Sequence, residues 1–414
     1  MLIDNNNKQE STGLVQWAEE FLGSNISFLP THTPESHIRS EFHKYESACL
    51  SMPDHYPIEK GGVRKWLDRE FQQLDPSLTC LLVKLAKSEL RYLNVLLVVL
   101  AHCYRWDSSP PPHDAAKQTH LSLPDGIGKL WSNVCLLTSQ KQVGTNASMF
   151  YWNWRLKGKG ANELYALDQL SIEKIETINC WLGNEHKEVL DRWVGIFVMI
   201  EAIGSIALRS LMNAVDAAEK KDEELVLFSL IETKEHMHKM VRIFGETVKS
   251  TKIDPDNWQK IVQPTYAWGI ESEEGRQRGP SGMQIGSLQG LSILLGIAAG
   301  SEIAKLTIDT QKYFLPSQQL FLRILMQKSD IIRRFVSKSR NSELIEAYNG
   351  CIKELALWRN SHMKRAAMYI EKAGVDINRS RISTGLTLPA VDNQKQIFID
   401  EMTARIEETR QAIV

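Results

Sequence analysis

The sequence predicts an all-α protein with a smaller N-terminal helical domain, residues 1–185, and a larger C-terminal helical domain, residues 186–414. Apolar residues recur at spacings of three and four through long segments, which is the period of an amphipathic helix. No segment shows the sustained alternation of apolar and polar residues that is typical of strands. The chain also lacks an internal repeat of solenoid length and any low-complexity tract.

The composition is that of an ordinary globular protein. Its 414 residues include 49 Lys and Arg against 50 Asp and Glu, and 43% of them are hydrophobic. This near-neutral balance disfavours a nucleic-acid partner, while the apolar content supplies a sizeable core. The eleven tryptophans are unusual and favour aromatic-lined pockets.

The lack of a recognisable signal peptide and the pattern of cysteines predict a cytoplasmic protein. The N-terminus, MLIDNNNKQESTG, is polar where a signal peptide needs a basic start and an apolar run. No stretch approaches the roughly 20 apolar residues of a membrane span, so no membrane partner is expected. The six cysteines include no C-x-x-C pair, which favours reduced thiols over a zinc ribbon or a disulfide framework.

Helices are expected in the following order. The first 75 residues mix short helical patterns with Pro and Gly, which indicates an irregular layer. The run from 78 to 106 is almost continuously apolar on one side and predicts a long buried helix, which SSPPPHDA ends. Further helical patterns cover residues 126–138, 147–156, 172–183, 187–219, 223–249, 286–311, 317–328 and 342–372.

The last of these predicted helices carries a histidine within its apolar stripe. The stripe runs through Leu355, Trp358, His362 and Tyr369, with successive spacings of three, four and seven residues. One interpretation is a core histidine that is hydrogen-bonded to a neighbouring carbonyl group. The other is an axial ligand of haem iron, with Arg359 one turn earlier available for a haem propionate. The residues alone leave both interpretations open.

Other groups of residues give weaker evidence for a catalytic or metal site. A di-iron site in a helical bundle would need two Glu-x-x-His motifs, and only Glu235 with His238 has this spacing, on a charged helix that predicts a solvated face. No nucleophile elbow or cysteine signature is present. The segment 263–287 is rich in Gly, Pro and charge, and its part from Gly275 to Ser287 is expected to have little packing of its own and to cover a ligand.

Four stretches together resemble the indoleamine 2,3-dioxygenase superfamily of haem proteins. GPSGMQIGSLQGLSILLGI (279–297) is similar to the family's glycine-rich loop and following helix. EAYNGCIKELALWRNSHMKRAAMYI (346–370) resembles its proximal helix, in which an Arg precedes the ligand His by three. ISTGLTL (382–388) resembles its substrate loop, and LNVLLVVLAHCYRW with FYWNW (150–154) its N-terminal part. The GPSG form also looks like the haem enzyme of pyrrolnitrin biosynthesis, a superfamily member.

The resemblance implies an indoleamine-dioxygenase-like fold and a site for haem b. His362 would be the iron ligand, and Arg359 would hold a propionate. Ser281 and Gly282 would lie over the opposite face of the haem, beside dioxygen and substrate. The substrate residues that it implies are Trp193, Phe197, Trp258, Gln263, Thr384 and Gly385.

Two of these positions depart from the family pattern. Phe197 stands where the family has a Ser, and Gln263 stands where it has an Arg that binds the substrate carboxylate. The pocket is therefore expected to be bulkier and drier, and to lack a fork of charge-assisted hydrogen bonds to a carboxylate.

The function that the resemblance implies is that of a haem-dependent oxygenase acting on tryptophan or a related indole with dioxygen. An alternative is a non-catalytic haem-binding sensor or carrier of the same fold, which the missing Arg favours. A third interpretation is a helical interaction protein that has lost the haem.

Overall fold

The computed structural model describes residues 13–23, 25–55, 62–107, 122–262, 265–266, 270–272, 275–277, 279–297, 302–372 and 394–414. Helices dominate these residues, as the sequence predicted. The helices are α2 Leu14–Leu22, α3 His43–Ser51, α4 Gly62–Phe71, α5 Pro76–Leu82, α6 Lys87–Trp106, α7 Asp125–Thr138, α8 Lys187–Glu219, α9 Glu223–Thr247, α10 Pro255–Asn257, α12 Gly286–Leu294, α13 Glu302–Gln311, α14 Pro316–Gln327, α15 Ile331–Val336, α16 Ser342–Lys372 and α17 Gln394–Arg410.

Shorter elements connect these helices. The single-turn helices are η1 Ser40–Phe42, η2 Met52–His55, η4 Ala147–Tyr151, η5 Leu167–Gln169, η6 Ile172–Lys174, η7 Asn184–His186, η8 Trp258–Val262 and η9 Gly282–Gln284. Two antiparallel ribbons pair β1 Trp154–Leu156 with β2 Ile175–Thr177, and β3 Ile270–Ser272 with β4 Gly275–Gln277.

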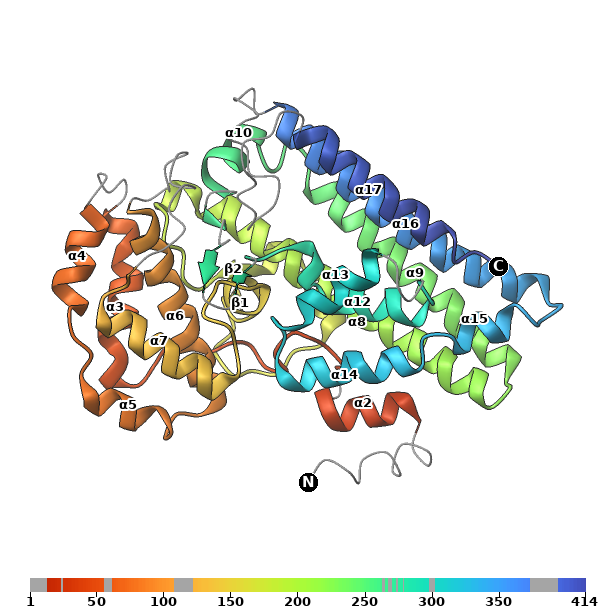
Figure 1. Ribbon diagram of the computed structural model, residues 1–414, viewed down its shortest axis with the longest axis horizontal. Helices are drawn as coiled ribbons and strands as arrows, with labels where there is room; N and C mark the ends of the chain where they lie inside the picture. The colour runs from red at the N-terminus through yellow and green to blue at the C-terminus, as the bar shows by residue number, and fades with distance from the viewer. Residues whose placement is uncertain are drawn as a thin grey trace.

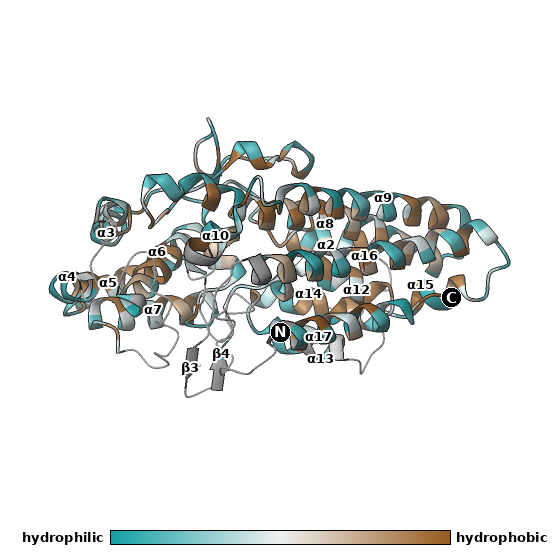
Figure 2. Cartoon of the chain, turned by 90° about the horizontal axis from the view of Figure 1, so that it is seen from above, coloured by the Kyte–Doolittle hydropathy of each residue, from teal (hydrophilic) through white to brown (hydrophobic). Residues whose placement is uncertain are grey.

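Long helices form one half of the molecule. Figure 1 shows α9, α16 and α17 running side by side over α8, with α3 to α7 gathered at the opposite end. The helix α8 is the centre of the core, and apolar residues extend along it (Figure 2). A helix over 184–219 is long and apolar enough to cross a membrane, which the sequence analysis had not expected, but 89% of its apolar window is buried inside the protein.

The N-terminal helix α2 packs against the C-terminal half. The ring of Trp17 stacks on Phe321 of α14, with centroids 6.0 Å apart. The backbone N–H of Leu14 donates to the carboxylate of Asp216 on α8 at 2.6 Å. Residues at both ends of the chain therefore share one core. A domain boundary at 185/186 remains a prediction.

Four predicted helices differ from the structure. The pattern at 286–311 forms two helices, α12 and α13, because α12 ends at Leu294 and the chain turns at Gly296, whose φ is +68°. The run from 78 to 106 is broken between α5 and α6, because Glu89 accepts a hydrogen bond from the N–H of Ala86 and starts a new helix there. The patterns at 147–156 and 172–183 form single helical turns followed by the ribbon β1–β2. Three-residue strands are too short to give a detectable alternation, although both strands bury their first and third residues.

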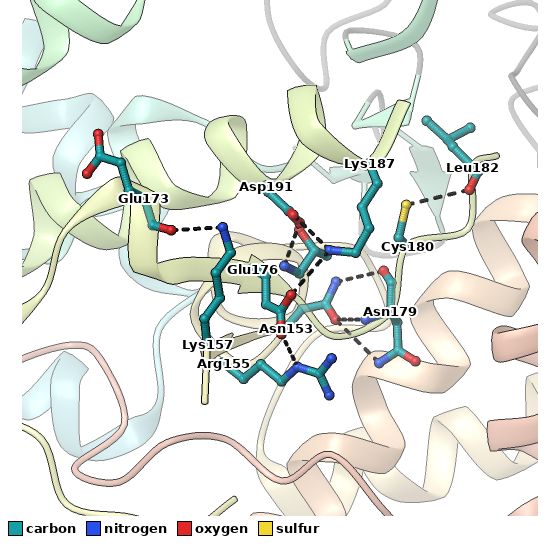
Figure 3. Close-up of polar contacts among 11 residues, drawn as sticks. Asn153, Arg155, Lys157, Glu173, Glu176, Asn179, Cys180, Leu182, Lys187 and Asp191 are labelled. Atoms are coloured by element: carbon teal, nitrogen blue, oxygen red, sulfur yellow. Dashed lines mark hydrogen bonds and ion pairs between the residues drawn. The ribbon is translucent and has the colours of Figure 1, made fainter. Parts of the chain in front are cut away.

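Ion pairs and a hydrogen bond join the ribbon β1–β2 to the start of α8 (Figure 3). Arg155 pairs with Glu176 across the ribbon at 2.6 Å, and Glu176 also lies 3.7 Å from the ammonium group of Lys187. Lys187 pairs in turn with Asp191 at 2.7 Å, and Asp191 accepts the backbone N–H of Thr177 at 2.7 Å. These contacts fix the first two turns of the helix that carries Trp193 and Phe197.

The crossing of α8 and α12 leaves no room for a side chain at Gly290. A Cβ atom there would lie 2.7 Å from a methyl carbon of Leu208 and 3.2 Å from one of Leu325. We predict that Gly290→Ala lowers the free energy of unfolding by about 1–3 kcal/mol, because it overpacks the core. Denaturant unfolding measures this change.

The matched control is Gly245→Ala in α9, where a Cβ would meet nothing within 4 Å. Alanine is the better helix former, so this variant is expected to gain about 0.5–1 kcal/mol. Equal effects at the two positions would contradict the packing argument.

Candidate active site

His362 lies on α16 between aromatic rings of two neighbouring helices. Its ring centroid is 6.1 Å from that of Phe244 on α9 and 6.3 Å from that of Phe398 on α17. Desolvation, and then the positive charge of Arg405, lowers the pKa of His362 to about 4. Neither ring nitrogen is hydrogen-bonded to a residue that the structure describes. A neutral imidazole with an available lone pair is the form that ligates a metal.

Arg359 lies one turn before His362 on the same helix. Its guanidinium donates to the hydroxyl of Ser292 on α12 at 3.1 Å and to the carbonyl of Arg405 on α17 at 3.4 Å. Burial, followed by repulsion from Arg405, lowers the pKa of Arg359 to about 10, so the group remains charged at neutral pH. The charge of Glu408 on α17 attracts Arg359, but no carboxylate of the described residues lies within ion-pair distance of it. The environment of Arg359 therefore suits an anionic group supplied from outside the chain.

Asn146, which precedes η4, holds the loop that contains Ser281 and Gly282. Its side chain accepts the N–H of Ser281 and donates to the carbonyl of Ser281, both at 2.9 Å. Its own N–H donates to Gln284, whose amide donates to the carbonyl of Gly279. The prediction that this loop has little packing of its own is therefore wrong for residues 279–287, most of which are buried. Gly282 itself is exposed, and a Cβ there would meet nothing within 4 Å.

The three predicted aromatic residues do come together. The ring of Trp193 on α8 meets Phe197 edge-on at 5.7 Å and Trp258 of η8 at 6.4 Å. Phe197 stacks on Phe150 of η4 at 4.0 Å, and Phe150 contacts Tyr266 at 4.9 Å. Neither Phe150 nor Tyr266 was predicted from the sequence as a site residue. Their signal is the aromatic density of FYWNW and of QPTYAW.

The aromatic cluster reaches α16 and contains two unused hydrogen-bond donors. Trp258 packs against Tyr369 at 5.5 Å, two turns after His362 on the same helix. The indole N–H of Trp193 and the hydroxyl of Tyr266 are buried with no hydrogen-bond partner among the described residues. Buried donors are nearly always paired in native proteins. A ligand with an acceptor atom between these rings would provide the missing hydrogen-bond partner.

Glu201 on α8 is a buried residue that the sequence analysis missed. Its carboxylate accepts the N–H groups of Gly286 and Ser287 at 2.9 and 3.0 Å, the hydroxyl of Tyr151 at 3.1 Å and that of Ser205 at 3.4 Å. It thus caps the first turn of α12, immediately after the Ser281 loop. Burial raises the pKa of Glu201 from 4.5 to about 7, against the lowering effect of these bonds. The available signal was one acidic residue within the apolar run FVMIEAIG.

Some predicted residues are not placed. Gln263, Thr384 and Gly385 lie outside the residues that the structure describes. The motif Glu235 and His238 gathers no metal-binding cluster, since His238 pairs with Glu354 of α16 at 3.2 Å on an exposed face. Among the described residues, no three His, Cys, Asp or Glu side chains are grouped to hold a metal ion.

The fold and these residues define a class: an all-α protein in which one helix carries a neutral histidine and an arginine without an ion-pair partner among the described residues, and packs its Tyr369 against an aromatic cluster. A family model described as indoleamine 2,3-dioxygenase matches residues 19–396. The chain belongs to this family, whose enzymes are haem-dependent dioxygenases.

Three curated relatives illustrate its range. The indoleamine 2,3-dioxygenase of Saccharomyces cerevisiae is 26% identical over 68% of this chain, and the match covers 65% of the yeast protein, just under two thirds. A 6-hydroxytryptophan 2,3-dioxygenase of Fusarium equiseti is 23% identical over 83% of this chain and 82% of its own length. A myoglobin of Haliotis diversicolor is 20% identical over 68% of this chain and 72% of its own length.

Because the pKa of Glu201 is raised, its proton is retained in the folded state and lost in the unfolded state between about pH 4.5 and 7. The free energy of unfolding therefore falls as pH rises through this window, by about 3 kcal/mol from this group. We predict that Glu201→Gln removes this dependence. Denaturant unfolding of both proteins at pH 5 and pH 7.5 measures the difference.

Tyr151→Phe provides the matched comparison, since it removes one donor that stabilises the carboxylate. It should raise the pKa of Glu201 further and extend the window upward. Identical pH slopes for wild type and Glu201→Gln would show that this carboxyl group does not titrate in the window.

Proposed function

We propose that the protein is a haem-dependent dioxygenase of tryptophan or a related indole, with haem b held by His362. Two neighbouring groups on α16 carry this proposal. One is a neutral imidazole without a hydrogen bond, and the other, one turn before it, is a partly buried guanidinium without an ion-pair partner among the described residues. An iron-bound macrocycle with anionic propionates meets both needs at once.

The surroundings fit that group. Phe244 and Phe398 offer apolar contact beside His362, and Arg405 adds a second positive charge near Arg359. A core histidine, the competing interpretation, would be expected to bond a neighbouring carbonyl, and no such bond is present among the described residues. When bound, haem iron supplies the binding and activation of dioxygen.

The chain's own task is orientation and exclusion of water. A flat indole would pack against the rings of Trp193, Phe197 and Trp258. Phe150 stacks on Phe197 and holds its ring in place. Their apolar surface removes water from the reacting atoms. By the family resemblance Ser281 would lie beside the substrate, and Asn146 holds its backbone through two hydrogen bonds. The reaction requires no protein general base in this proposal.

A second candidate is a haem protein that carries or senses a gas without turnover. The similarity to a protein named myoglobin supports it, as does Gln263 in place of a carboxylate-binding Arg. Product formation separates the two. Ferrous protein is incubated with oxygen and tryptophan, substituted tryptophans or indoles, and products that have gained oxygen are sought by mass spectrometry. Stable haem with no product from any substrate would favour the carrier.

We predict that His362→Ala abolishes stoichiometric haem uptake, because no other described side chain replaces the imidazole on that face of α16. Haem titration followed by the Soret band measures binding, and circular dichroism checks that helical content is retained. The control is His238→Ala, which removes an exposed histidine paired with Glu354 and should leave haem binding unchanged. A wild-type spectrum for His362→Ala would overturn the assignment.

We also predict weak selection for the amino acid part of the substrate. A buried carboxylate without a cation is costly, whereas a neutral indole loses little. Tryptophan and 3-methylindole should therefore bind within roughly tenfold of each other, or about 1.4 kcal/mol. Spectral titration of the haem-loaded protein gives both dissociation constants.

Gln263→Arg should improve tryptophan binding selectively, and the neutral control Gln263→Met should not. A strong native preference for tryptophan that Gln263→Arg fails to increase would show that the carboxylate is recognised by other residues.

A further inference from the structure

A cavity apart from the candidate active site lies between the N-terminal segment and the start of α6. It has a volume of about 280 Å³ and is lined by residues of the N-terminal segment (21–22 and 27–33), by Ser88 and Arg91 of α6, by Trp152 and Asn162, and by Leu315, Ser317 and Gln318. None of the residues of the candidate active site lines it. A ligand in this cavity would therefore bind whether or not the protein is a dioxygenase.

Arg91 is the charged group with spare donors in this cavity. Its guanidinium lies over the ring of Trp152, 4.4 Å from the ring centroid. Burial lowers the pKa of Arg91 to about 10, so it remains a cation at neutral pH. It forms no hydrogen bond or ion pair with any residue that the structure describes. Five N–H donors are therefore held in a rigid plane, with one face of the plane covered by an indole.

Three neighbouring polar side chains, those of Ser88, Asn162 and Gln318, are hydrogen-bonded within the protein. Ser88 and Asn162 both donate to the carboxylate of Glu35, which is thereby held by neutral donors and does not pair with Arg91. Gln318 donates to the carbonyl of Phe28 and accepts the N–H of Leu315. The unmet requirement of the cavity is thus an acceptor with negative charge for Arg91.

Part of the remaining lining is apolar, although Ser27, Thr31, His32, Thr33 and Ser317 also line the cavity. The side chains of Phe28, Leu29 and Leu315 are buried and contribute to the wall. A planar carboxylate can take two parallel N–H bonds from a guanidinium, while an attached ring or short chain gains by leaving water. We propose that this cavity is a binding site for a small organic monocarboxylate, with Arg91 as its counter-ion and the apolar wall around its body.

Benzoate is a suitable probe, and benzamide is its neutral counterpart of nearly the same shape. Isothermal titration calorimetry with the full-length protein, without added haem, should detect benzoate binding, with benzamide at least about tenfold weaker. Arg91→Gln should weaken benzoate by at least about tenfold, and Arg91→Lys less, since it keeps the charge and loses the fork. Arg242→Gln on α9, an exposed arginine paired with Glu246, is the matched control and should bind as wild type does.

A second variant protects the test against misfolding of the Arg91 variants. Ser317→Phe adds a ring at a partly exposed position in the wall and should block benzoate while leaving Arg91 in place. Unchanged benzoate affinity in Arg91→Gln, or equal affinity for benzoate and benzamide, would overturn the proposal. Equal affinity for inorganic phosphate and benzoate would also overturn it, because the apolar wall would then contribute nothing.

Discussion

The arrangement of the site depends on the hydrogen bonds of the Glu201 carboxylate, which is completely buried in the middle of α8. A carboxylate in an apolar core is costly unless donors surround it, so each donor must remain in place. Gly286 and Ser287 supply the start of α12, and Tyr151 supplies η4. One buried group thereby sets the relative positions of three elements.

Each of these elements carries part of the candidate active site. Helix α12 follows the loop of Ser281 and brings Ser292 to the guanidinium of Arg359. The turn η4 brings Phe150 against Phe197, which lies one turn before Glu201 on α8. A shift at the carboxylate would displace the loop, the aromatic cluster and the arginine together, since packed cores move as connected units.

The two proposed sites have a common electrostatic basis. Arg359 and Arg91 are both partly buried cations without a carboxylate partner among the described residues, although the whole chain is nearly neutral. An arginine cannot escape its charge by losing a proton at neutral pH, so each one is satisfied best by an external anion. The two sites also approach each other. Phe28 lines the Arg91 cavity and packs so tightly on Gly286 that a Cβ there would collide with its ring.

The sequence by itself determined the long helices and the spacing of groups within one helix. It predicted both bounds of α8 and the region in which α16 begins, because a strong period of three and four persists through many turns. His362 and Arg359 share a face of one helix, so their relation follows from helical geometry alone. The tertiary structure decided every contact between elements: Asn146 with Ser281, Glu201 with Gly286, Arg91 with Trp152. These partners lie 61 to 135 residues apart, and no local period encodes which faces of two helices will pack together.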